Sequence, residues 1–302
     1  MNKLLVITGP TAVGKTELSI KLAQKLGGEI VSADSRQVYS EMDIGTAKPT
    51  SSQRKKVPHH LLDVVRPDEP FSLADYQSQS YLAIDEVLAK GKKPFLVGGT
   101  GLYIQAVVDG LKIPKVPPNE NLRLELESLN AADLVARLSR IDLDSVRAIP
   151  PTNKRRLIRA IEVTELSGQP FSVLGRIYRR RYDTLQIGLT APRAELYRRA
   201  DIRVDRWLKN GWLDEVRNLR LKYPEHLPAL SSLGYRQMGM YLDGKITLAE
   251  AVQRTKFDIH GFIRRQVTWF RRDSRIYWYD TTESGYLADL ENRILSWYAE
   301  TI

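Results

Sequence analysis

Short runs of apolar residues alternate with helical patterns over roughly the first hundred residues of the chain. Residues 4–7, 29–32 and 94–97 have the length and composition of strands. Between them, apolar residues recur at helical spacing over residues 15–26 and 73–89, which are predicted to be helices. Strands and helices that alternate in this way predict a parallel, doubly wound α/β sheet flanked by helices.

The loop between the first strand and the first helix carries a recognisable motif. Residues 9–16 read GPTAVGKT, which matches the pattern G-x-x-x-x-G-K-[ST]. Backbone amides at a helix start attract an anion, and glycines allow the backbone to approach phosphate oxygens. We therefore predict a phosphate site in which Lys15 supplies positive charge and Thr16 offers its hydroxyl to Mg²⁺. Its residues are Gly9, Pro10, Thr11, Ala12, Val13, Gly14, Lys15 and Thr16.

Two further loops are expected beside this one, because the carboxyl ends of parallel strands share one edge of the sheet. Asp34 follows the second strand, where a carboxylate could hold Mg²⁺ through water, act as a base, or only cap a turn. Arg36 and Gln37 add donors for base edges, which a plain phosphate site does not require. Residues 98–101, Gly-Gly-Thr-Gly, follow the third strand and either join the site or form only a tight turn.

The pattern changes at Ile113, where prolines interrupt the chain and a largely helical stretch begins. The strand pattern returns over residues 185–189, and helical stretches are expected from there to the end. We therefore predict a phosphate-loop catalytic core, formed by residues 1–112 and 182–302, and an inserted helical domain of residues 113–181.

The charge of the chain predicts a polyanionic partner. Lys and Arg number 46 against 36 Asp and Glu, which gives a net charge of +10 at pH 7. Nucleic acid is favoured over a membrane surface, because no stretch approaches the roughly 18 apolar residues of a membrane span and the chain starts with a core strand instead of a signal peptide. We expect no membrane contact and a cytoplasmic location. With no Cys, disulfides and thiolate zinc sites are excluded, and His59-His60 is expected to be a hydrogen-bonded loop pair, not a catalytic one.

The predicted insert holds a dense cluster of cations opposed by only Glu162 and Glu165 between residues 154 and 181. The cluster is compatible with RNA binding and equally with a solvated helix face. Its members are Lys154, Arg155, Arg156, Arg159, Arg176, Arg179, Arg180 and Arg181.

Two later segments also combine cations with apolar residues. Arg199, Arg203 and Arg206 share one face of a predicted helix, where they could clamp a leaving diphosphate or simply face solvent. Residues 264–272, RRQVTWFRR, interleave aromatic rings with arginines, a combination suited to single-stranded RNA, although Trp269 can also belong to the core together with the next residue, Phe270.

Seven phrases, in register over nearly the whole chain, resemble bacterial tRNA dimethylallyltransferases, also called tRNA isopentenyltransferases. Each phrase is weak alone, but the ordered set is highly specific. The resemblance implies a P-loop NTPase-like fold with an inserted helical domain. The phrases are GPTAVGKT at 9–16, DSRQVY at 34–39, IGTAKP at 44–49, HHLLD at 59–63, GGTGLY at 98–103, GYRQ at 234–237 and TWFR at 268–271.

The resemblance implies transfer of a dimethylallyl group from dimethylallyl diphosphate to the exocyclic N6 amine of the adenosine on the 3′ side of the anticodon. It implies that the phosphate loop holds this isoprenoid diphosphate with Mg²⁺, where a kinase would hold ATP. Asp34 would accept the amine proton, Lys15 and Thr16 would bind diphosphate and metal, and Thr100 and Arg203 would line the reaction channel. The implied tRNA contacts are Asp34, Ser35, Arg36, Gln37, Thr100, Gly101, Arg123, Arg155, Arg156, Leu157, Ile158 and Arg159.

Three other functions are weighed against this one: a small-molecule kinase, an enzyme that prenylates free adenine nucleotides, and an RNA-binding module switched by nucleotide. Neither of the first two needs the basic insert or the arginine-aromatic segment. A switch module leaves Asp34 without a chemical role. We therefore expect the anticodon stem-loop of tRNA and dimethylallyl diphosphate as partners, and a monomeric enzyme.

Overall fold

The computed structural model describes residues 1–114, 116–174 and 180–300. They divide into two compact units, one of Met1–Val108 with Arg181–Ile302 and one of Asp109–Arg180. The smaller unit therefore begins shortly before the prolines that follow Ile113. Two cations of the predicted cluster, Arg176 and Arg179, lie outside the described residues.

The larger unit contains a six-stranded parallel sheet in the order β3-β2-β4-β1-β5-β6. Its central strands are almost wholly buried, as expected for parallel strands covered on both faces. They correspond to the predicted segments, so the predicted doubly wound sheet is confirmed. Their bounds are β1 Lys3–Thr8, β2 Gly28–Ala33, β4 Lys93–Gly98 and β5 Asp183–Thr190.

The two edge strands were not predicted. β3 consists only of His59–His60, which pair with Ile30 and Val31 of β2. β6, Ile276–Asp280, pairs with β5, so the prediction that the chain is helical from β5 to its end is wrong there. The reason is physical: two residues are too few to show a period, and in β6 only the first residue is buried.

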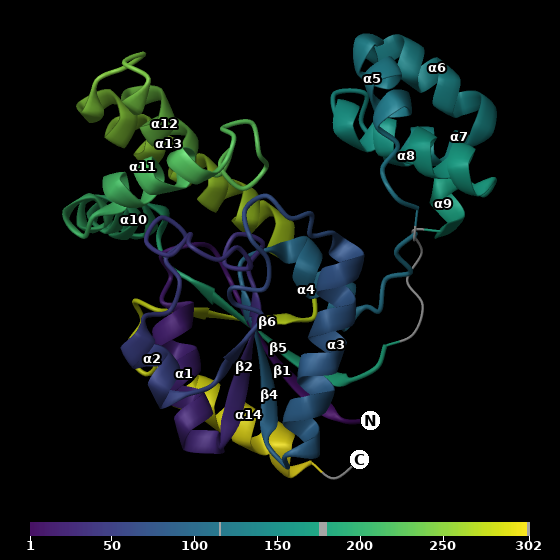
Figure 1. The fold of residues 1–302 in the computed structure, drawn as a ribbon. Helices are drawn as coiled ribbons and strands as arrows, with labels where there is room; N and C mark the ends of the chain where they lie inside the picture. Colours follow the sequence, from purple (N-terminus) through teal and green to yellow (C-terminus); the bar gives the residue numbers. More distant parts are fainter. Residues whose placement is uncertain (115, 175–179, 301–302) are drawn as a thin grey trace. The chain divides into compact units, whose positions relative to one another are not determined.

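Helices cover both faces of the sheet, with α1 and α2 on one side and α3 and α4 on the other (Figure 1). Helices α1 and α3 begin and end at the predicted residues, and Ser72 caps α3 in a capping box with Asp75. The α3 and α4 pair is joined by stacked Tyr76 and Tyr103 rings, whose centroids lie 3.7 Å apart. The bounds are α1 Lys15–Leu26, α2 Ser51–Lys56, α3 Leu73–Ala89, α4 Gly101–Val108 and α14 Tyr286–Ala299.

A group of four helices between β5 and β6 completes the larger unit. The longest, α13, packs against α10 and α12, and it also contacts α4 beside the sheet. Its buried residues form a mainly apolar stripe that includes Ile259, Ile263 and Phe270, and two polar side chains, Thr255 and Gln266, interrupt this stripe. The bounds are α10 Arg193–Lys209, α11 Trp212–Lys222, α12 Tyr235–Leu242 and α13 Leu248–Phe270.

The smaller unit is helical, as predicted for the insert, and has a hydrophobic core of its own. Its helix α8 supplies Leu157, Ile158 and Ile161 to that core, and helix α6 supplies Leu134 and Leu138. The bounds are α5 Glu120–Ser128, α6 Ala131–Ile141, α7 Leu143–Ala148, α8 Lys154–Ser167 and α9 Phe171–Leu174.

Candidate active site at the phosphate loop

The phosphate loop joins β1 to α1 and has the backbone that its glycines predict. Gly9 has φ 140° and Gly14 has φ 102°, in the region that glycine tolerates best. A Cβ at Gly9 would lie 2.4 Å from the carbonyl oxygen of Leu189 in β5, so a side chain has no room there. Gly14 caps α1 without a side-chain hydrogen bond, which leaves the first amides of α1 available to an anion.

Lys15 folds back over its own loop. Its Nζ donates to the carbonyl oxygens of Gly9, at 2.9 Å, and Pro10, at 2.8 Å. Burial lowers the pKa of Lys15 to about 7, although the negative charge of Asp34 raises it, and the positive charge of Arg203 lowers it further. A phosphate anion beside this amine would favour the charged form, so the site is electrostatically prepared for an anionic ligand.

Helix α10 delivers one arginine to the loop. Arg203 donates through Nη2 to the Thr11 hydroxyl at 2.6 Å, and its buried Nε has no hydrogen-bond partner among the described residues. Burial lowers the pKa of Arg203 to about 10, and the charge of Asp34 opposes this shift. The predicted face of three arginines is therefore divided, because Arg199 binds Glu195 and Arg206 is exposed.

The ends of β2 and β4 hold Asp34 next to Thr100. Asp34 Oδ1 accepts the Arg36 N–H at 2.9 Å, and the Thr100 hydroxyl accepts the Ser35 N–H at 3.0 Å. Asp34 therefore caps a turn with one oxygen, while its Oδ2 accepts no hydrogen bond from the part of the chain that the structure describes. Capping and a chemical role for Asp34 are thus compatible, since they use different oxygens.

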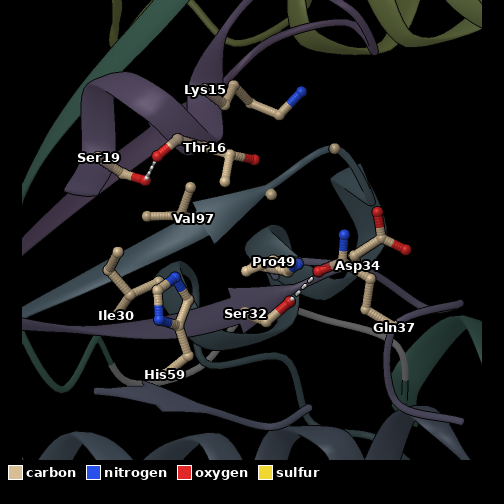
Figure 2. A pocket seen from close by; sticks show the side chains of 12 residues that line it. Lys15, Thr16, Ser19, Ile30, Ser32, Asp34, Gln37, Pro49, His59 and Val97 are labelled. Atoms are coloured by element: carbon tan, nitrogen blue, oxygen red, sulfur yellow. Dashed lines mark hydrogen bonds between the residues drawn. The ribbon is translucent and has the colours of Figure 1, made fainter. Parts of the chain in front are cut away.

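A cavity opens between α1 and the carboxyl ends of β2 and β4. Lys15 and Thr16 project from the start of α1 on one side of it, and Asp34 and Gln37 lie on another (Figure 2). The sequence predicted these four residues for one site, and the structure brings them together. The remaining lining includes Ser19, Ile30, Ser32, Pro49, His59 and Val97.

The side chains of Arg36 and Gln37 are already bound to the protein. Gln37 Nε2 donates to the carbonyl oxygens of Thr46 and Ala47, both at 3.3 Å, and its Oε1 accepts the Ser32 hydroxyl at 3.2 Å. Arg36 donates to the Pro228 carbonyl oxygen at 3.0 Å. Reading a base with these groups would require exchange of the present hydrogen bonds.

The two histidines are hydrogen-bonded, as predicted, although they form a short strand instead of a loop. His60 Nε2 lies 2.7 Å from buried Glu29, and His59 Nδ1 lies 2.8 Å from the Val57 carbonyl oxygen. Because a carbonyl oxygen only accepts, His59 Nδ1 carries a proton. Burial lowers the pKa of His59, which favours the neutral ring at the cavity wall.

Sequence reasoning missed two polar residues that hold the site. Glu215 of α11 accepts the N–H groups of Asp43, Ile44 and Gly45, so it fixes the loop that supports Gln37. Gln266 of α13 accepts the Thr11 N–H and donates to a neighbouring loop. For Gln266 a signal was present, since it falls on the apolar stripe of its helix.

The arginine-aromatic segment at the end of α13 divides between two environments. Phe270 is buried in the core, whereas Trp269 is 40% exposed. The indole lies against Gly101, where a Cβ would come within 2.2 Å of it. Arg264 and Arg265 are exposed, and the former donates to the Tyr197 hydroxyl at 2.9 Å.

In the smaller unit, several predicted RNA contacts are engaged internally. Buried Glu162 accepts two hydrogen bonds from Arg123, at 2.8 and 2.9 Å, and one from Arg159 at 2.6 Å. Leu157 and Ile158 are buried in the core of this unit. Exposed cations remain on the first turn of α8, namely Arg155 and Arg156.

Comparison with known proteins adds a decisive observation. The family model for IPP transferase matches residues 37–273, and the model for isopentenyl transferase matches residues 2–69. The chain belongs to the IPP transferase family. The resemblance to tRNA dimethylallyltransferases is thereby confirmed, and with it the class of enzyme, a transferase on a P-loop NTPase-like fold.

Members of the IPP transferase family match almost the whole chain. The tRNA dimethylallyltransferase of Roseiflexus sp. (strain RS-1) is 53% identical over 277 residues, which cover 90% of this chain and 91% of the relative. That of Thermomicrobium roseum is 44% identical over 302 residues, 97% of this chain and 92% of the relative.

Solved IPP transferase structures agree with the fold. The tRNA isopentenylpyrophosphate transferase of Bacillus halodurans is 40% identical, with a TM-score of 0.75 over 98% of this chain and 96% of that chain. A eukaryotic dimethylallyltransferase, described as acting on tRNA, is 28% identical, with a TM-score of 0.84 over 98% of this chain and 78% of that one. Among the described residues of this family member, every helix is too short or too polar to cross a membrane.

Proposed function

We propose that the chain transfers a dimethylallyl group from dimethylallyl diphosphate to the N6 amine of the adenosine on the 3′ side of the anticodon, with release of diphosphate. The observation that carries the proposal is one cavity lined by a phosphate loop and by Asp34. A donor held by Lys15 and Thr16 would thereby lie beside a carboxylate whose Oδ2 accepts no hydrogen bond from the described residues.

The donor site is proposed to use two half-buried cations. Lys15 and Arg203 both have pKa values lowered by burial, to about 7 and about 10, so an anionic ligand stabilises both charges. Arg203 Nε has no hydrogen-bond partner among the described residues, and it is a donor that a diphosphate oxygen would satisfy. As the bond between carbon and the diphosphate oxygen breaks, these cations would neutralise the negative charge that develops on the leaving group.

The residues also fit Mg²⁺, which prefers oxygen ligands. The Thr16 hydroxyl and the Asp34 carboxylate line the same cavity, and we propose that Thr16 binds the ion directly. When bound, Mg²⁺ would neutralise part of the charge of the diphosphate.

Asp34 is proposed as the proton acceptor. The amine of adenine is a weak nucleophile because its lone pair is delocalised into the ring, so the nitrogen must lose a proton as it bonds to the allylic carbon. Asp34 Oδ2 is available for that proton, while Oδ1 keeps the turn in place. Thr100, held beside it through Ser35, would line the path of the incoming base.

We propose that tRNA reaches the cavity with its target base turned out of the anticodon-loop stack, which costs a few kcal/mol. On the larger unit, the proposed contacts are Asp34, Ser35, Arg36, Gln37, Thr100 and Gly101. On the smaller unit, Arg155 and Arg156 are exposed for phosphate contacts, whereas Arg123 and Arg159 would act while paired with Glu162. For Leu157 and Ile158, whose side chains are buried, only main-chain contact is proposed. We further propose a monomeric enzyme that acts in the cytoplasm.

The test is to incubate protein, tRNA and Mg²⁺ with dimethylallyl diphosphate or with ATP, and to weigh the nucleosides after digestion. Prenylated adenosine with the first donor alone is the expected result. Phosphorylated product with ATP and no prenylated adenosine would instead assign the chain to the kinases. A further reaction with AMP in place of tRNA separates the enzyme from one that prenylates free nucleotides.

A further inference from the structure

Gln266 spans two loops of the site with one amide group. Its Oε1 accepts the Thr11 N–H at 2.8 Å, and its Nε2 donates to the Gly99 carbonyl oxygen at 2.8 Å. A flipped amide would oppose donor to donor and acceptor to acceptor, so the contacts define one orientation. The residue is only 6% exposed, so water does not readily replace either partner.

The surroundings indicate that this position is built for an amide. Ile259, Ile263 and Phe270 continue the buried stripe of α13, where an apolar residue would pack without the cost of burying polar atoms. Across the contact, a Cβ at Gly99 would come within 2.4 Å of Gln266 Nε2. The missing side chain at Gly99 is therefore what allows the approach.

The two bonded loops serve different halves of the proposed reaction. Thr11 belongs to the phosphate loop, and its hydroxyl accepts the hydrogen bond from Arg203. Gly99 precedes Thr100, whose hydroxyl accepts the N–H of Ser35, the residue after Asp34. Gln266 thus connects the donor side of the cavity to the side that holds the proton acceptor.

We propose that Gln266 is a positioning residue, which holds the phosphate loop against the Gly99 turn and so sets the affinity for dimethylallyl diphosphate. It acts through Thr11 and does not itself touch the donor. By holding the Thr11 amide, it keeps the loop in one conformation before the ligand arrives, which lowers the conformational cost of binding. This inference rests on the proposed function for the identity of the donor.

The experiment measures binding of dimethylallyl diphosphate with Mg²⁺ by calorimetry, without tRNA, in Gln266→Leu, Gln266→Asn and Gly99→Ala. Leu removes both hydrogen bonds, Asn is too short to make both, and Ala at position 99 displaces the amide from the opposite side. We expect donor affinity to fall about tenfold in Gln266→Leu, as for a lost buried hydrogen-bond pair. The tRNA affinity should change by less than about twofold.

Gln237 supplies a matched control. It is 2% exposed, accepts the Gly234 N–H at 2.8 Å and donates to Asp258. It lies in α12, and neither of these hydrogen bonds involves the phosphate loop. Gln237→Leu should lower the thermal midpoint about as much as Gln266→Leu and leave donor affinity unchanged. Such a split separates positioning of the loop from general loss of stability.

Unchanged donor affinity in folded Gln266→Leu and Gln266→Asn would overturn the inference. Tighter binding would overturn it too, because it would mean that the freed Thr11 amide binds phosphate better than it binds Gln266. If Gln266→Leu does not fold, the donor affinities of Gln266→Asn and Gly99→Ala test the inference instead. A wild-type protein that neither binds the donor nor prenylates tRNA would refute the proposed function instead, so the two failures are distinguishable.

Discussion

Positively charged side chains lie both at the phosphate loop and in the smaller unit, but their hydrogen-bond partners differ. At the loop, Lys15 and Arg203 are half-buried, and no carboxylate among the described residues is hydrogen-bonded to either of them. Burial lowers the pKa of both side chains. In the smaller unit, Arg123 and Arg159 bind the buried Glu162. The comparison distinguishes cations that are available to bind a compact anion from cations that stabilise the fold of the smaller unit.

A third group belongs to neither class. Arg155 and Arg156 are exposed on the first turn of α8, and this turn contains no acidic residue. Positive charge near a helix N-terminus is unfavourable, so an anionic partner would relieve it. Density of cations in the sequence therefore does not identify a binding surface until the partners of each cation are known.

The largest expected effect is on the rate of the chemical step, and it is expected from a substitution of Asp34 at the cavity. In Asp34→Asn the side-chain oxygen still caps the turn by accepting the Arg36 N–H, but the amide does not accept a proton. We expect the chemical step to slow by about a hundredfold or more. Single-turnover rates measure the loss, and filter binding should show little change in tRNA affinity. A near-normal rate would leave Asp34 with turn capping alone.

Glu162→Gln tests the arginines that stabilise the smaller unit. The substitution leaves Arg123 and Arg159 without a buried counter-charge, and we expect the free energy of unfolding to fall by about 2 kcal/mol, because both arginines are partly exposed. Chemical denaturation of the full chain measures it. Glu165→Gln, at a more exposed pair with Arg137, is the control and should cost less. Equal losses would show that burial of Glu162 does not matter.

The pH dependence of donor binding sharpens the contrast further. The pKa of Lys15 is about 7 in the free protein and should rise when diphosphate binds, since the anion stabilises the charged amine. Affinity is then greatest below pH 7 and falls as the pH rises, by up to about tenfold per unit. Calorimetric titrations across this range measure the slope. Lys15→Arg stays charged throughout and should flatten it; identical slopes would contradict the assignment.

The smallest effect is expected from the exposed cations of α8. Each phosphate contact to a single strand contributes roughly 0.7 to the slope of log affinity against log salt. Replacing Arg155 and Arg156 with Ala should therefore flatten that slope by up to about 1.4, with no change in donor affinity. Arg147→Ala, at an exposed ion pair with Asp144, is the control. An unchanged slope in the double variant would place the RNA surface elsewhere, with exposed Arg264 and Arg265 as the next candidates.

Much of the larger unit was predictable because its signals are local. The bounds of α1 and α3 follow from apolar spacing, together with a glycine end in one and a capping box in the other. Asp34 could be placed at the cavity because the carboxyl ends of parallel strands converge.

The rest depends on contacts between distant parts of the chain. Gln266 is 255 residues from Thr11 and 167 from Gly99, so no local pattern reveals that it bonds to both. The division of the arginine cluster also required the structure, because spacing along α8 does not say which cations meet Glu162. The position of buried Glu162, and not the number of cations nearby, determines which arginines form internal ion pairs.

The order of the strands has a consequence for synthesis on the ribosome. β1 emerges early, yet in the sheet it lies between β4 and β5, and β5 follows only after the smaller unit. Gly9 packs against the β5 backbone, and the Thr11 amide cannot form its hydrogen bond to Gln266 until α13 has been synthesised. Because a nascent chain grows at about 5–20 residues per second, the phosphate loop spends about ten seconds or more without its final contacts. The nascent protein acquires a finished donor site only late in translation, after the smaller unit has had time to fold alone.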